Sequence, residues 1–464
     1  MSSCRRQFNR HSLHPWADLP ALGEDDSTPV IVSGEGIYIT DDEGRRMIDG
    51  PAGMWCMQTG YGRREIADAV SEQIMRLGYS TAFSTINPRE VELAKRIASE
   101  TPGDLNRVFF TTGGSTAVDS ALRLCQLANN IKGRRNRKHI LARDRGYHGS
   151  TFLSASVTGK ERDKTAMDTH QDYVHFLSSP SHFHHHQELS EAAFCDFLVE
   201  ELESKILELG PDNVMCFIAE PVLGSGGVVV PPADYNRRCW EVVKKYGIVY
   251  IADEVVTAFG RLGYWFASEK VFDVVPDIIT FAKGLTSGYV PLGGFAVSDA
   301  FIDDISGEDS RGNIYSNGYT WSANPVSCAA ALASWDIIER ENLLQHVRDI
   351  GPYFQRQLRT LRDIPLVADV RGIGLMAAVE MRHETGASGE QLLSQDYALG
   401  DLVDSYCHQF GLLVRPLINI CIMSPPLIIS REQIDDLVLA LRKALELAQE
   451  EIRSGKHAEV LAPE

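Results

Sequence analysis

Two charged residues, Asp253 and Lys283, each follow a short apolar run that is typical of a buried β-strand. Strands that end in this way would carry a carboxylate and an amine into one enclosed site. An amine can form a Schiff base with a carbonyl group, and a carboxylate can keep a pyridine nitrogen protonated. Pyridoxal phosphate requires both groups, so the pair predicts a site for that cofactor.

The position of Lys283 in the sequence favours a catalytic role for this residue over a structural one. A lysine at the end of a buried strand has no common structural role, because desolvation penalises its charged form. The same desolvation lowers the pKa of the amine and makes it nucleophilic. Glu220 also follows an apolar run. A buried carboxylate needs a partner, and either a site or a structural ion pair could supply one.

Residues 109–117 read Phe-Phe-Thr-Thr-Gly-Gly-Ser-Thr-Ala and lead from a predicted strand into a helix. Free N–H groups at the start of that helix, with the hydroxyl groups of Ser115 and Thr116, suit a phosphate dianion. A capped turn without a ligand is the alternative. The pattern is not Gly-x-Gly-x-x-Gly, which argues against a dinucleotide. Tyr147 lies between glycines and could lie flat on a planar cofactor, with simple packing as the alternative.

These residues need a sheet whose strands end at one edge. Between residues 62 and 330, apolar runs bounded by Gly and Pro alternate with helical patterns. This alternation predicts an α/β fold with a largely parallel sheet and helices on both faces. The expected strands are 108–110, 139–143, 215–219, 249–252, 278–281 and 293–297, and the expected helices are 115–130, 192–209 and 232–246.

The alternation of strand and helix patterns ends near residue 330, and a smaller α+β domain is expected over residues 331–464. The N-terminal segment 1–61 contains a hairpin pattern and would pack with it, while residues 62–330 would form the large cofactor-binding domain. The patterns that support this division are helical at 352–362 and 433–452 and strand-like at 36–40, 46–49, 375–378 and 412–415.

Composition limits the possible partners and locations. A chain of 464 residues suggests two or three domains, and a net charge of −18 argues against nucleic-acid binding. No run reaches the roughly 18 apolar residues of a membrane span. The N-terminus lacks the apolar core of a secretory signal, and the nine cysteines form no CxxC pair. We therefore expect reduced thiols and a cytoplasmic protein.

Residues 182–186 read His-Phe-His-His-His, which raises the question of a metal site. Consecutive histidines cannot all face one ion, so we expect no metal and a surface loop at the entrance of the active site.

Together, the ordered motifs resemble the class III aminotransferases of the ω-amino acid:pyruvate type, which have pyridoxal-phosphate fold type I. The resemblance extends from residue 53 to residue 426. It implies a mostly parallel seven-stranded sheet and a smaller α+β domain built from both termini. The motifs are Gly-Gly-Ser at 113–115, Tyr-His-Gly at 147–149, Ala-Glu-Pro-Val at 219–222, Asp-Glu-Val at 253–255, Ala-Lys-Gly at 282–284 and Gly-Tyr-Thr at 318–320.

The resemblance assigns the catalytic residues and those around the cofactor ring. Lys283 would form the Schiff base with pyridoxal phosphate and move the substrate proton. Asp253 would pair with the pyridine nitrogen, while Tyr147 and Val255 would cover the two faces of the ring.

The resemblance also assigns the remaining cofactor contacts. Gly114 and Ser115 would bind the phosphate, and His148 and Glu220 would lie beside the cofactor. Thr320 would reach the phosphate of a neighbouring subunit. The site would therefore be complete only in a homodimer, with a tetramer left open.

Substrate selection is implied at two positions, with Tyr147 beside them. Trp55 matches the aromatic wall of the large pocket and is expected to be exposed in a Gly-rich loop, with a core tryptophan as the alternative. Arg415 stands where family members carry a mobile arginine that binds the carboxylate of a keto acid, a task that suits a guanidinium group. After this arginine the family often has Gly-Asp, whereas this chain has Leu-Ile-Asn at 417–419.

We therefore predict a ping-pong aminotransferase that moves an amino group from an ω-amino acid, terminal amine or diamine to pyruvate or a similar keto acid. Within the family, the alternatives are a 2-oxoglutarate-linked 4-aminobutyrate or ornithine enzyme, an aminomutase and a decarboxylating member. A cofactor-binding protein without turnover is disfavoured because Lys283, Asp253, Tyr147 and Thr320 occur together. A nucleotide-binding protein is disfavoured because the chain has no Walker or Rossmann glycine pattern.

Overall fold

The computed structural model describes residues 11–16, 29–307, 311–382 and 389–454. Its largest sheet has seven strands in the order β4-β10-β9-β8-β7-β5-β6. The strands from β9 to β6 are parallel to one another, whereas β10 is antiparallel to both of its neighbours. The strands are β4 (Arg107–Thr111), β5 (His139–Arg143), β6 (Val174–Leu177), β7 (Val214–Ala219), β8 (Val249–Asp253), β9 (Ile278–Phe281) and β10 (Gly293–Val297).

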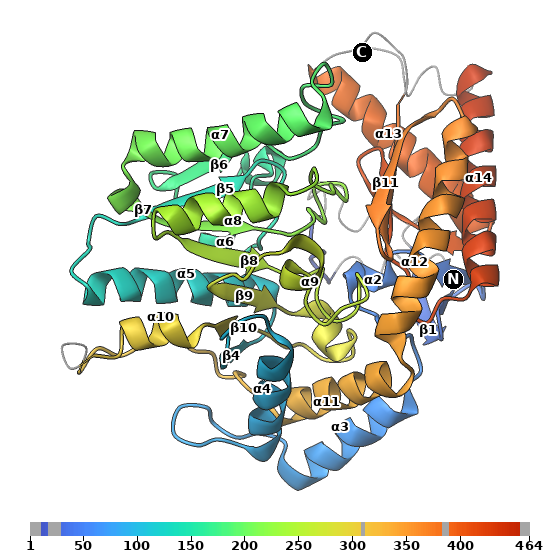
Figure 1. Cartoon of the computed structure of the whole chain (residues 1–464). Coiled ribbons are helices and arrows are strands. Elements are labelled where there is room, and N and C mark those ends of the chain that lie inside the picture. Colours follow the sequence, from blue (N-terminus) through green and yellow to red (C-terminus); the bar gives the residue numbers. More distant parts are fainter. Residues whose placement is uncertain (1–10, 17–28, 308–310, 383–388, 455–464) are drawn as a thin grey trace.

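Helices cover both faces of this sheet (Figure 1). Helix α5 (Gly114–Ile131) lies on one face, and α7 (Glu191–Leu209) and α8 (Tyr235–Lys245) lie on the other. Alternate side chains of β7 enter two different apolar clusters, with Phe217 on the side of α7 and α8 and Ile218 on the side of α5. Every residue of β7 is buried, which explains its unbroken apolar run.

The topology brings the chemical residues to one edge of the sheet. Strands β5, β7, β8 and β9 are parallel, so their carboxyl ends meet at the same edge. Strand β4 points the same way as β9, because β10 is antiparallel to both. The loops that follow these five strands, and the start of α5, therefore converge there.

Two further sheets have four strands each. The first has the order β1 (Ile31–Glu35), β2 (Tyr38–Asp41), β3 (Arg46–Asp49) and β13 (Leu412–Leu413). The second has the order β11 (Val367–Ile373), β12 (Met376–Met381), β15 (Ile420–Met423) and β14 (Arg415–Leu417). Because β13 pairs with β3, the N-terminal hairpin joins the C-terminal part of the chain, as predicted. The predicted fold class is confirmed, and the boundaries at residues 61 and 330 stay a prediction.

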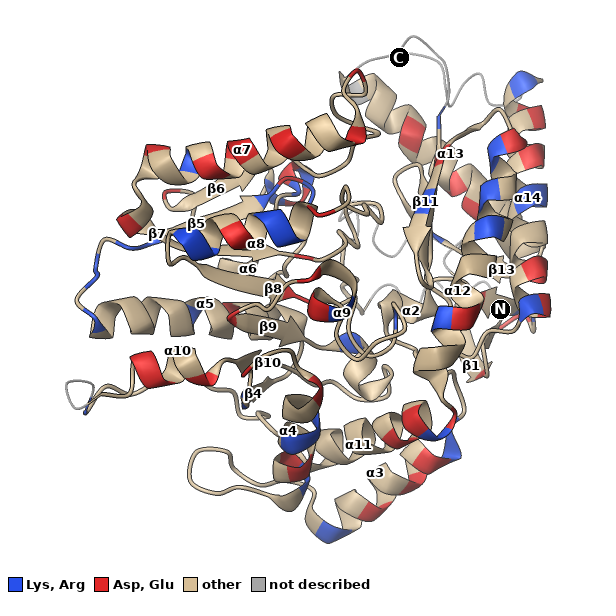
Figure 2. Ribbon diagram, viewed as in Figure 1, with Lys and Arg blue, Asp and Glu red and all other residues tan. Residues whose placement is uncertain are grey.

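Helices α12 (Leu343–Arg359), α13 (Gly389–Gln409) and α14 (Arg431–Arg453) pack around these smaller sheets. Charged residues are frequent along the outer helices, whereas the central strands carry few (Figure 2). The described residues include no helix that is long and apolar enough to cross a membrane. The other α-helices are α2 (Ala52–Trp55), α3 (Arg64–Leu77), α4 (Pro88–Glu100), α6 (Phe152–Ser156), α9 (Ser268–Phe272), α10 (Asp299–Asp304) and α11 (Pro325–Arg340).

Several elements differ from the sequence prediction. Strand β6 was not expected. The helix expected at 352–362 begins earlier, at Leu343, and Pro352 lies inside it. The single strand expected at 412–415 is two strands, β13 and β14, which belong to different sheets.

Candidate active site

Lys283 is the first residue of a 3-10 turn (Lys283–Thr286) that follows β9. Its φ angle of 41° lies in the left-handed region, which is strained for a residue with a side chain. The next residue must be glycine, because a Cβ on Gly284 would lie 2.5 Å from Gln58 Nε2. Burial lowers the pKa of Lys283, while the charges of Asp253 and Glu220 oppose this shift. The environment therefore favours the free amine more than water does.

Asp253 is buried and its carboxylate accepts three hydrogen bonds. The Nδ1 of His148 lies 2.7 Å from one carboxylate oxygen. The other oxygen accepts from the backbone N–H of Val255 at 3.1 Å and from Thr280 Oγ1 at 3.0 Å. Thr280 reaches Asp253 because the two residues are paired in the register of β8 and β9. This network holds the carboxylate in one orientation.

Glu220 fixes the loop that carries Tyr147. It is buried, and its two carboxylate oxygens accept hydrogen bonds from the backbone N–H groups of Tyr147 at 2.9 Å and Gly224 at 2.8 Å. Burial raises the pKa of Glu220; the nearby His148 opposes this shift and Asp253 adds to it. Glu220 therefore links the ends of β5 and β7 at the edge where Asp253 lies.

The start of α5 is packed closely against its neighbours. A Cβ on Gly114 would lie 2.9 Å from Val255 Cγ1, so only glycine lets Val255 approach the helix. Ser115 Oγ accepts a hydrogen bond from the backbone N–H of Ser150 at 3.1 Å. Gly149 has a φ angle of 137°, and a Cβ there would lie 2.6 Å from Ser115 Oγ. The helix start, with its free N–H groups, thus lies beside Val255 and the loop after Tyr147.

Trp55 brings the predicted substrate residues next to Lys283. The Lys283 Nζ lies 5.3 Å from the centre of the Trp55 ring, and the guanidinium carbon of Arg415 lies 5.8 Å from it. Burial lowers the pKa of Arg415. The expectation of an exposed Trp55 is wrong, because the side chain is only 4% exposed and packs in an apolar cluster with residues such as Val222.

Thr320 does not join these residues. It is exposed, and no hydrogen bond or ion pair connects it to another candidate residue within the described ranges. Large apolar side chains around it are exposed as well, with Trp321 at 57% and Phe83 at 74%. Trp321 contacts Tyr79 edge-on at 5.6 Å, and a Cβ on Gly318 would touch the Phe83 ring. These side chains form an apolar surface beside Thr320.

The histidines at 182–186 contact different partners. His184 Nε2 lies 2.8 Å from Glu380 Oε1, His182 Nε2 bonds the carbonyl oxygen of Leu189, and His186 Nδ1 bonds Glu188. In the part of the chain that the structure describes, no group of three or more His, Cys, Asp or Glu side chains is arranged to hold a metal ion.

The residues at this edge fit pyridoxal phosphate by their chemistry. They supply a primary amine of lowered pKa, a buried carboxylate held by hydrogen bonds, and a helix start that glycine leaves open. Sequence reasoning missed Thr280 and Ser150, which hold Asp253 and Ser115. The signal for Thr280 was its place as the one hydroxyl residue in an apolar strand.

Comparison with known proteins identifies the family. The family described as aminotransferase class III matches residues 21–445. A putrescine–pyruvate aminotransferase from Pseudomonas aeruginosa is 38% identical over 438 residues, which cover 94% of this chain and 94% of that protein. A γ-aminobutyrate transaminase from Solanum lycopersicum is 36% identical over 439 residues, which cover 93% of this chain and 84% of that protein.

Solved structures agree with the sequence relatives. An (S)-enantioselective ω-transaminase from Thermomicrobium roseum superimposes with a TM-score of 0.91 and 36% identity, covering 96% of this chain and 98% of that chain. An ω-transaminase from Pseudomonas jessenii, solved in complex with PMP, gives a TM-score of 0.92 at 32% identity, covering 97% and 99%. The chain therefore belongs to the class III aminotransferases, which depend on pyridoxal phosphate.

Proposed function

We propose that this aminotransferase moves an amino group from an ω-amino acid, terminal amine or diamine to pyruvate or a similar keto acid. The donor becomes an aldehyde or ketone, and the keto acid becomes an amino acid. The supporting observation is that Arg415 and Lys283 lie on the same aromatic ring, that of Trp55. A keto acid whose carboxylate pairs with Arg415 would then present its carbonyl group close to the reacting amine.

The residues at the sheet edge divide the work between binding and proton transfer. Pyridoxal phosphate supplies an electrophilic carbonyl carbon and a ring that takes up electrons. Lys283 would hold the cofactor through its amine, and the same amine, once free, would move the proton at the donor carbon. Asp253, held by His148 and Thr280, would keep the ring nitrogen protonated.

Four further residues would orient the cofactor. Tyr147 and Val255 would cover its two faces, and Gly114 and Ser115 would hold the phosphate at the start of α5, where unpaired N–H groups favour an anion. Glu220 supports Tyr147 through the backbone bond described above.

We place Thr320 in the active site of a second copy of the chain. Its exposed position, next to the uncovered side chains of Trp321 and Phe83, is what a subunit interface would explain. A homodimer would cover this apolar surface.

Eight cysteines of the described ranges are free thiols, which supports a cytoplasmic location.

The choice of acceptor tests this proposal. The purified holoenzyme is first treated with an excess of an amine donor until the visible absorbance of pyridoxal phosphate is lost, and the donor is then removed. Pyruvate should restore that absorbance faster than 2-oxoglutarate at equal concentration. Recovery with 2-oxoglutarate and none with pyruvate would contradict the choice of pyruvate and would support a 2-oxoglutarate-linked enzyme instead.

A further inference from the structure

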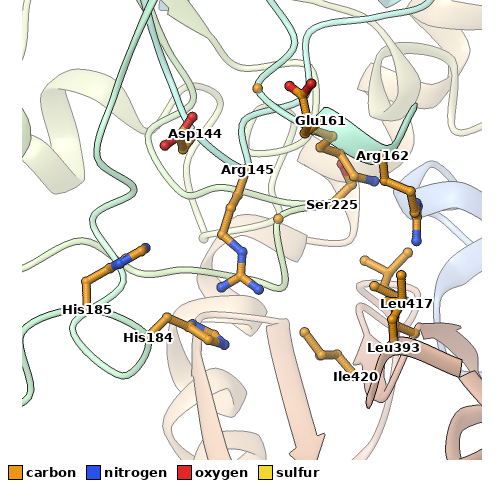
Figure 3. Close-up of a pocket in the computed structure, with 14 residues that line it drawn as sticks. Asp144, Arg145, Glu161, Arg162, His184, His185, Ser225, Leu393, Leu417 and Ile420 are labelled. Atoms are coloured by element: carbon orange, nitrogen blue, oxygen red, sulfur yellow. The ribbon is translucent and has the colours of Figure 1, made fainter. Parts of the chain in front are cut away.

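A pocket of about 560 Å³ lies beside the active site, between the loops after β5 and the strand β14. Its size is in the range of small-molecule sites, and most of its wall is apolar. Leu393, Leu417 and Ile420 form one side, and Arg145 enters from the other (Figure 3).

The pocket adjoins Tyr147 and the strand that begins at Arg415. Lys160 lines it, and the Lys160 Nζ lies 5.8 Å from the centre of the Tyr147 ring. Leu417 and Ile418 follow Arg415 by two and three residues. Ser225, another wall residue, directly follows Gly224, whose N–H bonds Glu220. A substrate bound at Lys283 and longer than pyruvate could therefore extend into this pocket.

Two polar atoms in the pocket wall are buried without a partner. The Nη1 of Arg145 and the Oγ of Ser225 have no hydrogen bond to any residue that the structure describes. Leaving such donors buried and unpaired costs free energy. Arg145 also has a φ angle of 65°, which is strained for a residue with a side chain. Figure 3 shows its side chain pointing into the pocket. Both atoms are donors that a ligand could satisfy.

The neighbouring charges are already paired. Glu380 lies 2.8 Å from His184 and 2.7 Å from Arg371. Its negative charge is therefore already paired with these two residues and compensates the charge of Arg145 less. Lys160 pairs with Asp163 at 3.3 Å, and Arg162 pairs with the same carboxylate at 2.9 Å.

Two carboxylates also line the pocket, but they lie away from Arg145. Asp144 and Glu161 are exposed. Figure 3 shows both carboxylates at the edge opposite the Arg145 guanidinium, which lies between His184 and Ile420. The end of the pocket at Arg145 is therefore cationic.

We propose that this pocket binds the distal carboxylate of a long ω-amino acid donor, with Arg145 Nη1 and Ser225 Oγ as its hydrogen-bond donors. This inference rests on the proposed function and narrows the donor class. The methylene chain packs on Leu417 and Ile420, and the carboxylate accepts from the two unpaired atoms. A diamine fits worse, because its second ammonium group would be desolvated beside Arg145.

The test compares two donor series on the holoenzyme. One series is 4-aminobutanoate, 6-aminohexanoate and 8-aminooctanoate, and the other is the alkylamines with the same numbers of carbons. The second-order rate constant for the loss of cofactor absorbance gives an acid-to-alkylamine ratio for each length. In the wild type this ratio should be highest for the six- or eight-carbon pair. Arg145→Gln should lower that ratio about tenfold or more, because a charge-assisted hydrogen bond is lost.

Two further variants separate a specific contact from a general effect. Ser225→Ala is nearly isosteric and should lower the same ratio about threefold or more, through loss of one neutral donor. Arg162→Gln removes the same charge at the rim of the pocket, from a residue already paired with Asp163, and should change the ratio less than about twofold.

Three outcomes would overturn the assignment of Arg145. These are an unchanged ratio in both Arg145→Gln and Ser225→Ala, an equal loss in Arg162→Gln, and a wild-type ratio that does not rise with length. If no amine of either series changes the wild-type absorbance, the proposed function itself fails. If the amines react but the ratios do not respond, only the carboxylate pocket fails.

Discussion

The chemistry depends on how Lys283 and Asp253 are held. Lys283 has a lowered pKa because burial removes water from its amine, although Asp253 and Glu220 favour its charged form. Asp253 stays in place because His148 and Thr280 approach its two oxygens from different elements. The amine is therefore poised to react, while the carboxylate is held for a cationic partner.

Asp253→Asn tests this assignment at a single residue. The amide keeps the size of the side chain but removes the charge that would hold the ring nitrogen protonated. We expect the turnover rate to fall about a hundredfold or more, as for other losses of a key electrostatic group. Visible absorbance of bound cofactor should persist, because Lys283 is unchanged.

The matched control is Asp299→Asn, which removes a surface ion pair with Arg107. This variant should keep its rate within about twofold of the wild type. Turnover by Asp253→Asn at the wild-type rate would contradict the role given to that carboxylate.

The residues at strand ends could be predicted from the sequence, because an apolar run that ends in a charged residue is a local sequence pattern. Their partners could not. Thr280 reaches Asp253 through strand register, and Ser225 shares a pocket with Arg145 through the meeting of two loops. Such contacts join residues distant in sequence, and no local pattern marks them. Trp55 shows the same limit, because its Gly-rich surroundings suggested exposure and tertiary packing buried it.

At the scale of elements, parallel strands explain why one edge of the large sheet holds the site. Six strands of that sheet were predicted from their apolar runs. Strand β6 was missed because its four residues include a histidine and none is part of a longer apolar run. Pro352 suggested a helix start, yet it lies inside α12. The expected strand at 412–415 is divided into β13 and β14 because the chain passes from one sheet to another at Val414.

Helix α13 gives a test of stability against pH. Asp404 is half-buried, its Oδ1 has no hydrogen-bond partner among the described residues, and it lies 3.6 Å from His408 Nε2. Burial and the nearby Asp401 raise the pKa of Asp404 to about 7. The folded protein therefore holds this proton more tightly than the unfolded chain, whose aspartates have a pKa of about 4. The stabilisation is present at low pH and is lost as the pH rises through 7.

Asp404→Asn should remove this dependence, because the amide has no proton to lose. We expect the melting temperature of the variant to exceed that of the wild type at pH 8, and the difference to narrow as the pH falls to 5. Thermal unfolding at several pH values measures this. The exposed Asp68→Asn on α3 is the control and should show no such trend. A difference between Asp404→Asn and wild type that is constant with pH would refute the argument.

At the scale of the whole molecule, we propose that the site takes residues from two copies of the chain. Thr320 and the apolar surface around Trp321 and Phe83 are exposed in a single chain. Such a surface is costly in water and is typical of an interface. We therefore propose that the holoenzyme is a symmetric dimer with two shared sites.

Mixing two inactive variants tests this arrangement. Lys283→Ala lacks the amine, and Thr320→Asp places a negative charge where the partner's phosphate would bind. In a mixed dimer, one site combines both defects and the other combines both intact residues. After unfolding and refolding an equal mixture, we expect activity to return to about a quarter of the wild-type value, as symmetric pairing predicts. Each variant refolded alone serves as the control. No recovery in a mixture shown by native mass spectrometry to contain mixed dimers would contradict a shared site.

The central claim, that this chain transfers an amino group through Lys283, is tested most directly by following the nitrogen atom. The holoenzyme is incubated with a terminal amine labelled with nitrogen-15 and with unlabelled pyruvate, and the alanine formed is analysed by mass spectrometry. The account predicts labelled alanine with the wild type and none with Lys283→Ala. Absence of labelled alanine with the wild type across ω-amino acids, alkylamines and diamines, or equal labelling with Lys283→Ala, would contradict it.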